Sequence, residues 1–203
     1  MVTKVKICGL TRIQDVEAAE DFGADAVGFV MEPSSPRFVG GIEDLRILAR
    51  GVGPYSTSVA VFGDMPDITE FDLGVQAIQA LTFHDGIKVS YRRIATVRIG
   101  DGAASRPLDQ LRATDSALLV DAFHPEALGG TGTRVDWNLA AEIVAACPKP
   151  VILAGGLTPE NVSECIRIVR PYGVDVSSGV EISPGIKDPL KIRDFIQAAK
   201  ASL

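Results

Sequence analysis

Two glycine-bearing turns near the C-terminus have the residue types of an anion-binding site. Each turn follows an apolar run typical of a buried strand, in Val151-Ile-Leu-Ala-Gly-Gly-Leu-Thr-Pro-Glu160 and in Val174-Asp-Val-Ser-Ser-Gly-Val-Glu181. Glycine lets the backbone approach an anion closely, and exposed N–H groups at a helix start supply donors and a positive dipole. Neither turn contains lysine or arginine. We therefore predict that a phosphorylated small molecule binds to the backbone N–H groups of Gly155, Gly156, Ser178 and Gly179.

Cys8 and Asp121 have the chemistry needed for proton transfer. Each lies at the C-terminal end of a predicted strand, so both side chains are expected at the same end of a parallel sheet. A thiol with a lowered pKa can act as a base, and a carboxyl with a raised pKa can act as an acid. The residues alone leave both roles open, because cysteine is often a plain buried residue and a strand-end aspartate can be a turn residue or a cap.

Three further polar residues, Arg37, His84 and Arg98, fall at or beyond the ends of predicted strands. Arg37 follows a proline-bearing loop and is a candidate to bind a carboxylate, with a solvated loop arginine as the alternative. His84 is a candidate substrate contact, with a structural hydrogen-bonding histidine as the alternative. The two histidines lie 40 residues apart and the three cysteines form no CxxC pair, so we predict neither a metal site nor a disulfide framework.

Strands alternating with helices must position these residues. The predicted strands cover residues 5–8, 26–30, 58–62, 80–83, 94–99 and 117–121, followed by two that begin at Val151 and Val174. The predicted helices cover residues 11–22 with Thr11 as N-cap, 42–50, a segment around 68–75, 107–112 and 137–146, followed by two that begin near Pro159 and Asp188.

Eight strand–helix pairs of about 25 residues each predict a single-domain (β/α)8 TIM barrel over residues 1–203. In such a barrel the loops after strands 7 and 8 build a phosphate site, which is where the two glycine turns fall. The weakest segment is 86–92, which leaves room for only about a turn of helix. An open doubly wound sheet, with its site at a switch point, is the alternative architecture.

Composition and charge exclude several classes of function. The chain has 203 residues, 46% of them hydrophobic and only 6% aromatic, which is typical of buried parallel strands. Its net charge of −6, without blocks of like charge, argues against nucleic acid and against a polybasic membrane patch. No apolar run reaches the roughly 18 residues that span a bilayer. We expect a cytoplasmic protein without a signal peptide, because the N-terminus leads directly into a strand and the cysteines suit a reducing compartment.

Six motifs, in order along the whole chain, closely resemble phosphoribosylanthranilate isomerase, a tryptophan-pathway family. They are Lys6-Ile-Cys-Gly-Leu-Thr11, Ser35-Pro-Arg37, Val61-Phe62, Asp121 followed by Gly129-Gly-Thr-Gly-Thr-Arg-Val-Asp-Trp137, Ala154-Gly-Gly-Leu-Thr-Pro-Glu-Asn-Val162, and Val174-Asp-Val-Ser-Ser-Gly-Val-Glu181 with Pro184-Gly185 and Lys187-Asp188.

The resemblance implies a (β/α)8 barrel that needs no cofactor and performs an Amadori rearrangement. It converts the phosphoribosyl aminoaldose of anthranilate into the corresponding aminoketose. By this resemblance Cys8 is the general base, Asp121 is the general acid, and Arg37 binds the anthranilate carboxylate.

The chain departs from the family on one side of the expected barrel mouth. The family usually ends its fourth strand with Gln-Leu-His-Gly, whereas this chain reads Leu81-Thr-Phe-His-Asp-Gly86, so His84 can be matched but its neighbours cannot. Arg98 stands where a lysine is expected. Two other functions remain as alternatives: a sugar-phosphate isomerase of histidine biosynthesis or a dual-substrate version of it, and a non-catalytic phosphate-binding barrel. The histidine-pathway enzymes carry a carboxylate at the end of the first strand, where this chain has Cys8, and this disfavours the first alternative. The presence of both the acid and the base disfavours a non-catalytic barrel.

Overall fold

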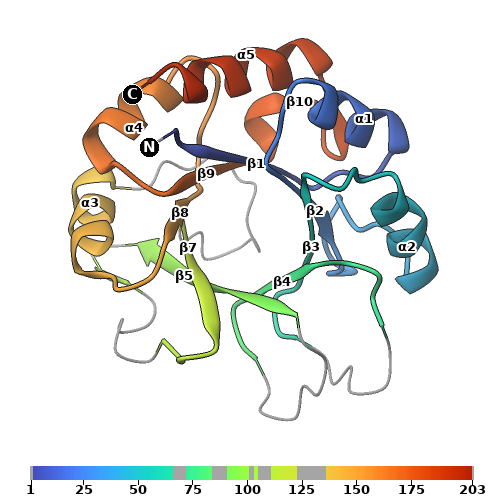
Figure 1. The fold of residues 1–203 in the computed structure, drawn as a ribbon, viewed down its shortest axis with the longest axis horizontal. Coiled ribbons are helices and arrows are strands. Elements are labelled where there is room, and N and C mark those ends of the chain that lie inside the picture. The colour runs from blue at the N-terminus through green and yellow to red at the C-terminus, as the bar shows by residue number, and fades with distance from the viewer. Residues whose placement is uncertain are drawn as a thin grey trace.

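Eight parallel strands form a closed barrel in the computed structural model, which describes residues 2–65, 72–83, 91–100, 103–104, 111–122 and 136–202 (Figure 1). Neighbouring strands pair in the order β4-β3-β2-β1-β9-β8-β7-β5, and a further pairing of β4 with β5 closes the ring. The strands are β1 Lys4–Cys8, β2 Ala26–Val30, β3 Thr57–Val61, β4 Ala77–Ala80, β5 Arg92–Gly100, β7 Asp115–Ala122, β8 Val151–Leu153 and β9 Gly173–Val176. The closed ring confirms the predicted (β/α)8 architecture over the open sheet.

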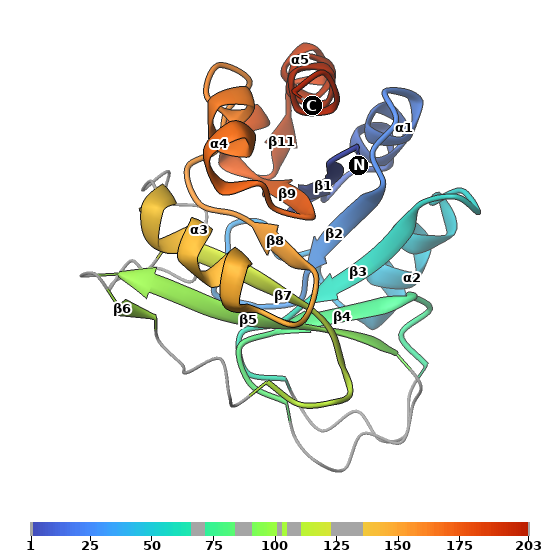
Figure 2. The ribbon, with the colours of Figure 1, turned by 60° about the vertical axis from the view of Figure 1, so that its left-hand side comes forward.

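The described helices lie outside the ring, beside β3, β2, β1, β9 and β8 in Figure 1, and Figure 2 shows α1, α5 and α4 beyond β1, β2 and β9. The described helices are α1 Ile13–Asp21, α2 Ile42–Arg50, α3 Trp137–Ala146, α4 Val162–Val169 and α5 Pro189–Lys200. The remaining described elements are the 3-10 turn Ser178–Val180 and three short strands: β6 Ala103–Ala104 beside the end of β5, and the antiparallel pair β10 Glu181–Ser183 and β11 Ile186–Lys187. The helices expected around 68–75 and over 107–112 fall largely outside the described residues, and the described parts, 72–75 and 111–112, are not helical.

Aspartate side chains begin two of these helices where the sequence indicated a start. Asp136 accepts hydrogen bonds from the backbone N–H groups of Asn138 and Leu139 at the start of α3. Asp188 does the same for Leu190 and Lys191 at α5, whose first residue is a proline. Both therefore satisfy backbone donors that a helix start leaves unpaired. The helix near Pro159 begins later than predicted, at Val162.

Thr11 does not cap α1, contrary to the prediction. The residue at the N-cap position is Arg12, which forms no side-chain capping hydrogen bond. The Thr11 hydroxyl instead donates to the backbone carbonyl of Gly185 at 2.6 Å. Thr11 therefore ties the loop after β1 to the β10–β11 turn, a long-range contact that local capping rules do not anticipate.

The fourth strand covers residues 77–80 and not the predicted 80–83. Its register sets Ala77 opposite Val59 of β3 and Arg92 of β5, and its four residues are all buried. The aromatic and β-branched residues that suggested a later strand lie beyond its end, where Phe83 packs under the guanidinium of Arg93, 4.1 Å from the ring centre. Pairing with β3 and β5 therefore sets the position of the fourth strand, and it outweighs the higher strand propensity of the residues that follow.

The apolar core has two parts that follow from strand alternation. The larger cluster joins the outward faces of the strands to the helices. The smaller one fills the barrel interior and comprises Val59, Ala77, Ile94, Ala117, Leu119 and Ala154. Polar residues occupy the inward positions of β1 and β9, so this side of the interior carries charge instead of aliphatic packing.

Candidate active site

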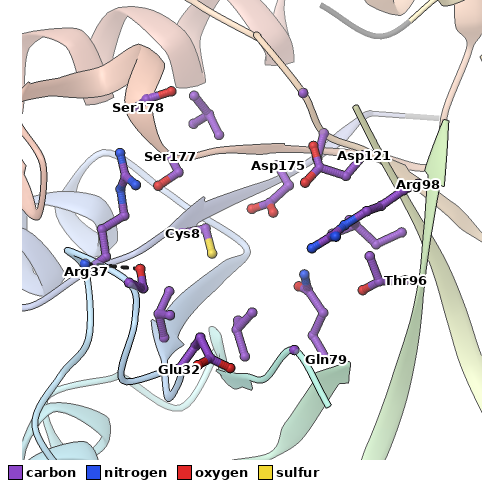
Figure 3. A pocket seen from close by; sticks show the side chains of 18 of the residues that line it. Cys8, Glu32, Arg37, Gln79, Thr96, Arg98, Asp121, Asp175, Ser177 and Ser178 are labelled. Atoms are coloured by element: carbon purple, nitrogen blue, oxygen red, sulfur yellow. Dashed lines mark hydrogen bonds between the residues drawn. The ribbon is translucent and has the colours of Figure 1, made fainter. Parts of the chain in front are cut away.

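The C-terminal ends of the strands surround one cavity that gathers most of the predicted site residues (Figure 3). Its lining includes Cys8, Arg37, Asp121, Gly155, Gly156 and Ser178. Gly179 is not among the lining residues, and His84 lies outside the described residues. The barrel thus brings together the proposed acid, the proposed base and most of the two glycine turns.

Cys8 is the last residue of β1, and its thiol lies inside the barrel beside Lys6. Inward-facing residues alternate along a strand, so Lys6 and Cys8 share one face. Gly28 of the neighbouring β2 makes room for both, because a Cβ on it would lie 2.9 Å from the Cys8 Sγ and 2.9 Å from the Lys6 Nζ. Burial raises the pKa of the Cys8 thiol, while the Lys6 charge opposes this effect.

Lys6 forms a buried ion pair with Asp175 of β9. The Lys6 Nζ donates to both carboxylate oxygens of Asp175, at 3.0 and 3.1 Å. Only 3% of Lys6 and 7% of Asp175 are exposed, so the charges lie in a poorly solvated environment. Burial raises the pKa of Asp175, and Lys6 partly offsets this. Burial also lowers the pKa of Lys6, but the charges of Asp175 and Cys8 outweigh this and the Lys6 pKa is raised overall.

A second buried ion pair joins Arg37 to Glu181, the first residue of β10. The Arg37 Nε and Nη2 donate to the two oxygens of Glu181 at 2.8 and 2.7 Å, a bidentate geometry. The Lys187 Nζ donates to the same carboxylate at 2.8 Å and to the carbonyl of Ser177 at 3.1 Å. Burial alone would raise the pKa of Glu181, but these two cations outweigh it and hold the pKa below its usual value.

Arg37 keeps part of its donor capacity despite this pairing. Its Nη1 has no hydrogen-bond partner within the described part of the chain. The guanidinium lies on the side of the cavity formed by Ser177 and Ser178, away from Asp121 and Arg98 (Figure 3). Glu181 therefore fixes the guanidinium while leaving N–H groups for a second anion.

The two glycine turns pack directly against each other. A Cβ on Gly179 would overlap the carbonyl oxygen of Leu157, so only glycine permits this approach of the turn after β9 to the turn after β8. Gly155 and Gly156 adopt φ of 92° and 65°, a region that favours glycine. The element after β9 is a single 3-10 turn, Ser178–Val180, and not a longer helix.

Asn161 holds the turn after β8 in shape. Its side chain accepts a hydrogen bond from the Thr158 N–H at 2.8 Å and donates to the Gly156 carbonyl at 2.9 Å. These bonds fix the backbone on the C-terminal side of Gly156. The turn is therefore preorganised without a charged side chain.

The opposite wall of the cavity comes from β4, β5 and β7. Arg98 and Asp121 are register partners on β5 and β7, and Thr96 and Gln79 lie on the same side in Figure 3. The Gln79 Oε1 is buried and has no hydrogen-bond partner among the described residues. In β4 and just beyond it, Gln79 and Leu81 line the cavity.

The predicted site residues do not include Lys6, Asp175, Glu181 or Lys187. A signal was present for the first two, because strand alternation places Lys6 on the face of Cys8 and the first and last strands of a closed barrel are neighbours. Register pairs Lys6 directly with Asp175. Nothing local in the sequence indicated that Glu181 would bind Arg37, 144 residues away.

Across the described ranges, no group of three or more His, Cys, Asp or Glu side chains is arranged to hold a metal ion. None of the described helices has the length and apolarity needed to cross a bilayer.

Comparison with known proteins identifies the family. Residues 5–198 match the family model of N-(5'-phosphoribosyl)anthranilate (PRA) isomerase. The chain is 42% identical to N-(5'-phosphoribosyl)anthranilate isomerase of Pelobacter propionicus, covering 97% of this chain and 95% of that protein. It is also 42% identical to the enzyme of the same name from Thiobacillus denitrificans, over the full length of both.

Solved structures agree with this result. A phosphoribosyl anthranilate isomerase in complex with reduced 1-(o-carboxyphenylamino)-1-deoxyribulose 5-phosphate superimposes with a TM-score of 0.79 at 33% identity, covering 98% of each chain. The enzyme of Thermus thermophilus gives a TM-score of 0.81 at 32% identity, covering 97% of this chain and 98% of that one. The chain belongs to the N-(5'-phosphoribosyl)anthranilate isomerase family.

Proposed function

We propose that Cys8 is the general base and Asp121 the general acid of the reaction that defines this family. The chain is an isomerase of L-tryptophan biosynthesis that converts N-(5-phosphoribosyl)anthranilate into 1-(2-carboxyphenylamino)-1-deoxyribulose 5-phosphate. The observation that carries the assignment is that a thiol and a carboxyl, from strands far apart in the sequence, line the same cavity.

The reaction requires one proton donor and one proton acceptor. Asp121 protonates the ring oxygen of the furanose, which opens the ring and leaves a Schiff base at C1′. The Cys8 thiolate then removes the proton from C2′ and gives an enolamine. Loss of the enol proton and protonation of C1′ produce the ketone, so the rearrangement consumes no net proton.

The two ends of the substrate bear different anions, and the cavity offers a different kind of donor to each. We assign the phosphate to the backbone N–H groups of Gly155, Gly156, Ser178 and Gly179, and the anthranilate carboxylate to Arg37. Solved relatives support a phosphorylated ligand, since one was crystallised with a reduced ribulose 5-phosphate compound. His84 stays an expected substrate contact.

These assignments require only a small phosphorylated substrate. We propose that the enzyme acts in the cytoplasm without a cofactor, a metal, nucleic acid or a membrane. The net charge of −6 and the widely spaced free cysteines support this proposal.

The test is direct. Purified protein is mixed with freshly made phosphoribosylanthranilate, and loss of the substrate's fluorescence is followed in parallel with Cys8→Ser and Asp121→Asn. We expect rapid loss with the wild type and almost none with either variant. Wild-type protein that leaves the fluorescence unchanged would reject the activity, whereas two fully active variants would reject only the residue assignment.

A further inference from the structure

Lys6 is a buried lysine next to the proposed base, and the proposed proton transfers give it no role. A Cβ on Gly28 would lie 2.9 Å from the Lys6 Nζ and 2.9 Å from the Cys8 Sγ, so these two atoms flank the same small space. Both side chains rise from β1 into the barrel interior, where 97% of the Lys6 surface is removed from solvent. A long basic side chain in such a place needs a partner to stay charged.

Asp175 is that partner. It lies on β9, the strand next to β1, and register sets it directly opposite Lys6. Contacts of 3.0 and 3.1 Å from one ammonium to both carboxylate oxygens are those of an ion pair. In Figure 3, Asp175 points into the cavity between Cys8 and Asp121. The pair therefore keeps a positive charge beside the thiol and a negative charge toward the centre of the cavity.

The other charged side chains around Cys8 are bound to other partners or lie on the far side of the cavity. Arg37, after β2, and Lys187, on β11, are both bound to the carboxylate of Glu181. Asp121 projects from β7 on the far wall. The neighbouring strand β2 contributes Gly28, which carries no charge. The loop after β2 contributes Glu32 to the cavity lining, and its carboxylate accepts a hydrogen bond from the Ser34 hydroxyl at 3.1 Å. Burial raises the pKa of the Cys8 thiol, and Lys6 is the foremost influence that lowers it, ahead of Lys187, while Asp175 raises it.

We propose that Lys6 is a positioning residue for the base: its ammonium, held against Asp175, stabilises the Cys8 thiolate in an otherwise unfavourable buried site. The proposal rests on the assignment of Cys8 as base. Asp175 then has two opposing effects, because it holds Lys6 in place and also weakens the field that Lys6 exerts on sulfur.

The pH titration of Cys8 without substrate tests this proposal. Thiolate formation is read from the ultraviolet absorbance difference between each protein and its counterpart that also carries Cys8→Ser. Lys6→Met preserves length and removes the charge, Lys6→Arg preserves the charge, and Asp175→Asn removes the opposing carboxylate. Circular dichroism confirms that each variant is folded.

We expect Lys6→Met to shift the thiol titration upward by at least about 1 pH unit, as loss of a neighbouring opposite charge does. Asp175→Asn should shift it downward, and Lys6→Arg should remain near the wild type. At neutral pH, kcat/KM of Lys6→Met should fall about tenfold for each unit of that shift. A Cys8 that titrates at the wild-type pH in Lys6→Met would overturn the proposal.

Lys6→Met leaves Asp175 as an unpaired buried carboxylate, which can destabilise the fold. The double variant Lys6→Met/Asp175→Asn removes both charges and is compared with Asp175→Asn alone. The double variant should titrate at higher pH, and equal titrations would contradict the proposal. Because no substrate is present, this result is independent of the isomerase assay: an active Cys8→Ser enzyme would reject the base assignment even if Lys6 controlled the thiol.

Discussion

The two buried ion pairs of the cavity differ in what their basic partners still offer. The single ammonium of Lys6, beside the Cys8 thiol, contacts both oxygens of Asp175. Arg37 uses two of its nitrogens to bind Glu181, and its Nη1 is left to bind another group. Burial is the largest influence on both acids, yet the pKa of Asp175 is raised while that of Glu181 is lowered. Glu181 is hydrogen-bonded to two cations and Asp175 to one, which contributes to this difference.

This difference separates the cavity into two regions. The proposed proton-transfer region comprises Lys6, Cys8, Asp121 and Asp175. The proposed binding region comprises Arg37, Glu181, Lys187 and the two glycine turns. Damage to the first region should lower kcat, and damage to the second should raise KM, because its contacts are similar in the ground and transition states.

The largest effect is expected from Cys8→Ser. A serine hydroxyl is a far weaker base than a thiolate at neutral pH, so kcat should fall by about 10³-fold or more. Binding of a reduced product analogue, measured by calorimetry, should survive. Cys147→Ser, which alters a thiol at the end of α3, is the matched control and should keep wild-type kcat. Near-wild-type activity of Cys8→Ser would remove Cys8 from the mechanism.

Asp121→Asn is expected to come next. The amide cannot donate the proton that opens the ring, so kcat should fall by about 10²- to 10⁴-fold with little change in circular dichroism. The kcat/KM profile should also lose the limb that reports this acid. A profile identical in shape to that of the wild type would contradict the assignment.

Arg37→Ala should act on the other region. Losing a charge-assisted hydrogen bond of about 1.5–3 kcal/mol should raise KM about 10- to 100-fold with a much smaller change in kcat. Arg37→Lys keeps the charge but not the bidentate geometry, so its KM should lie between those of the wild type and Arg37→Ala. If kcat fell and KM were unchanged, the carboxylate would not be bound at Arg37.

Gly156→Ala should raise KM by about tenfold, because the methyl group obstructs the phosphate and φ of 65° disfavours alanine. Gly23→Ala is the matched control, since Gly23 has φ of 89° and follows α1 away from the cavity. It should lose stability without any change in KM. Inorganic phosphate should compete with substrate in the wild type and do so less well in Gly156→Ala.

Glu181→Gln should have the smallest effect on catalysis, a rise of a few-fold in KM, since it loosens the hold on Arg37. Its effect on stability depends on pH. The pKa of Glu181 is lowered in the folded protein, so its stabilisation is present above the ordinary pKa and is lost as pH falls through the folded value. The Tm of the variant should lie below that of the wild type at neutral pH, and the two should converge in acid. A constant difference at all pH values would contradict this.

Much of the fold could be predicted because apolar runs and helix signals repeat at a regular spacing. The strand over residues 26–30 and the helices over 42–50 and 137–146 agree with the structure residue for residue. The fourth strand was misplaced because its short Ala-Ile-Gln-Ala run carries a weak propensity, while its position is set by pairing with β3 and β5. Local preference could not supply that information.

The site was only partly predictable for a similar reason. Cys8, Asp121 and the glycine turns are visible as residue types at strand ends. The charged neighbours of Cys8 and Arg37 depend instead on strand order and on the length of the side chains. Lys6 and Asp175, for example, form an ion pair although they are 169 positions apart in the sequence. Closure of the barrel makes β1 and β9 neighbours and so pairs Lys6, beside the proposed base, with Asp175.

Single-turnover kinetics test the division of the cavity most directly. Enzyme in increasing excess over phosphoribosylanthranilate converts it once, and the limiting rate of fluorescence loss is measured. We predict that Arg37→Ala and Gly156→Ala approach the wild-type limiting rate at high enzyme concentration, because excess enzyme overcomes weak binding, whereas Cys8→Ser and Asp121→Asn stay slow at every concentration. A Cys8→Ser enzyme that reached the wild-type rate, or an Arg37→Ala enzyme that stayed as slow as Cys8→Ser, would contradict the account.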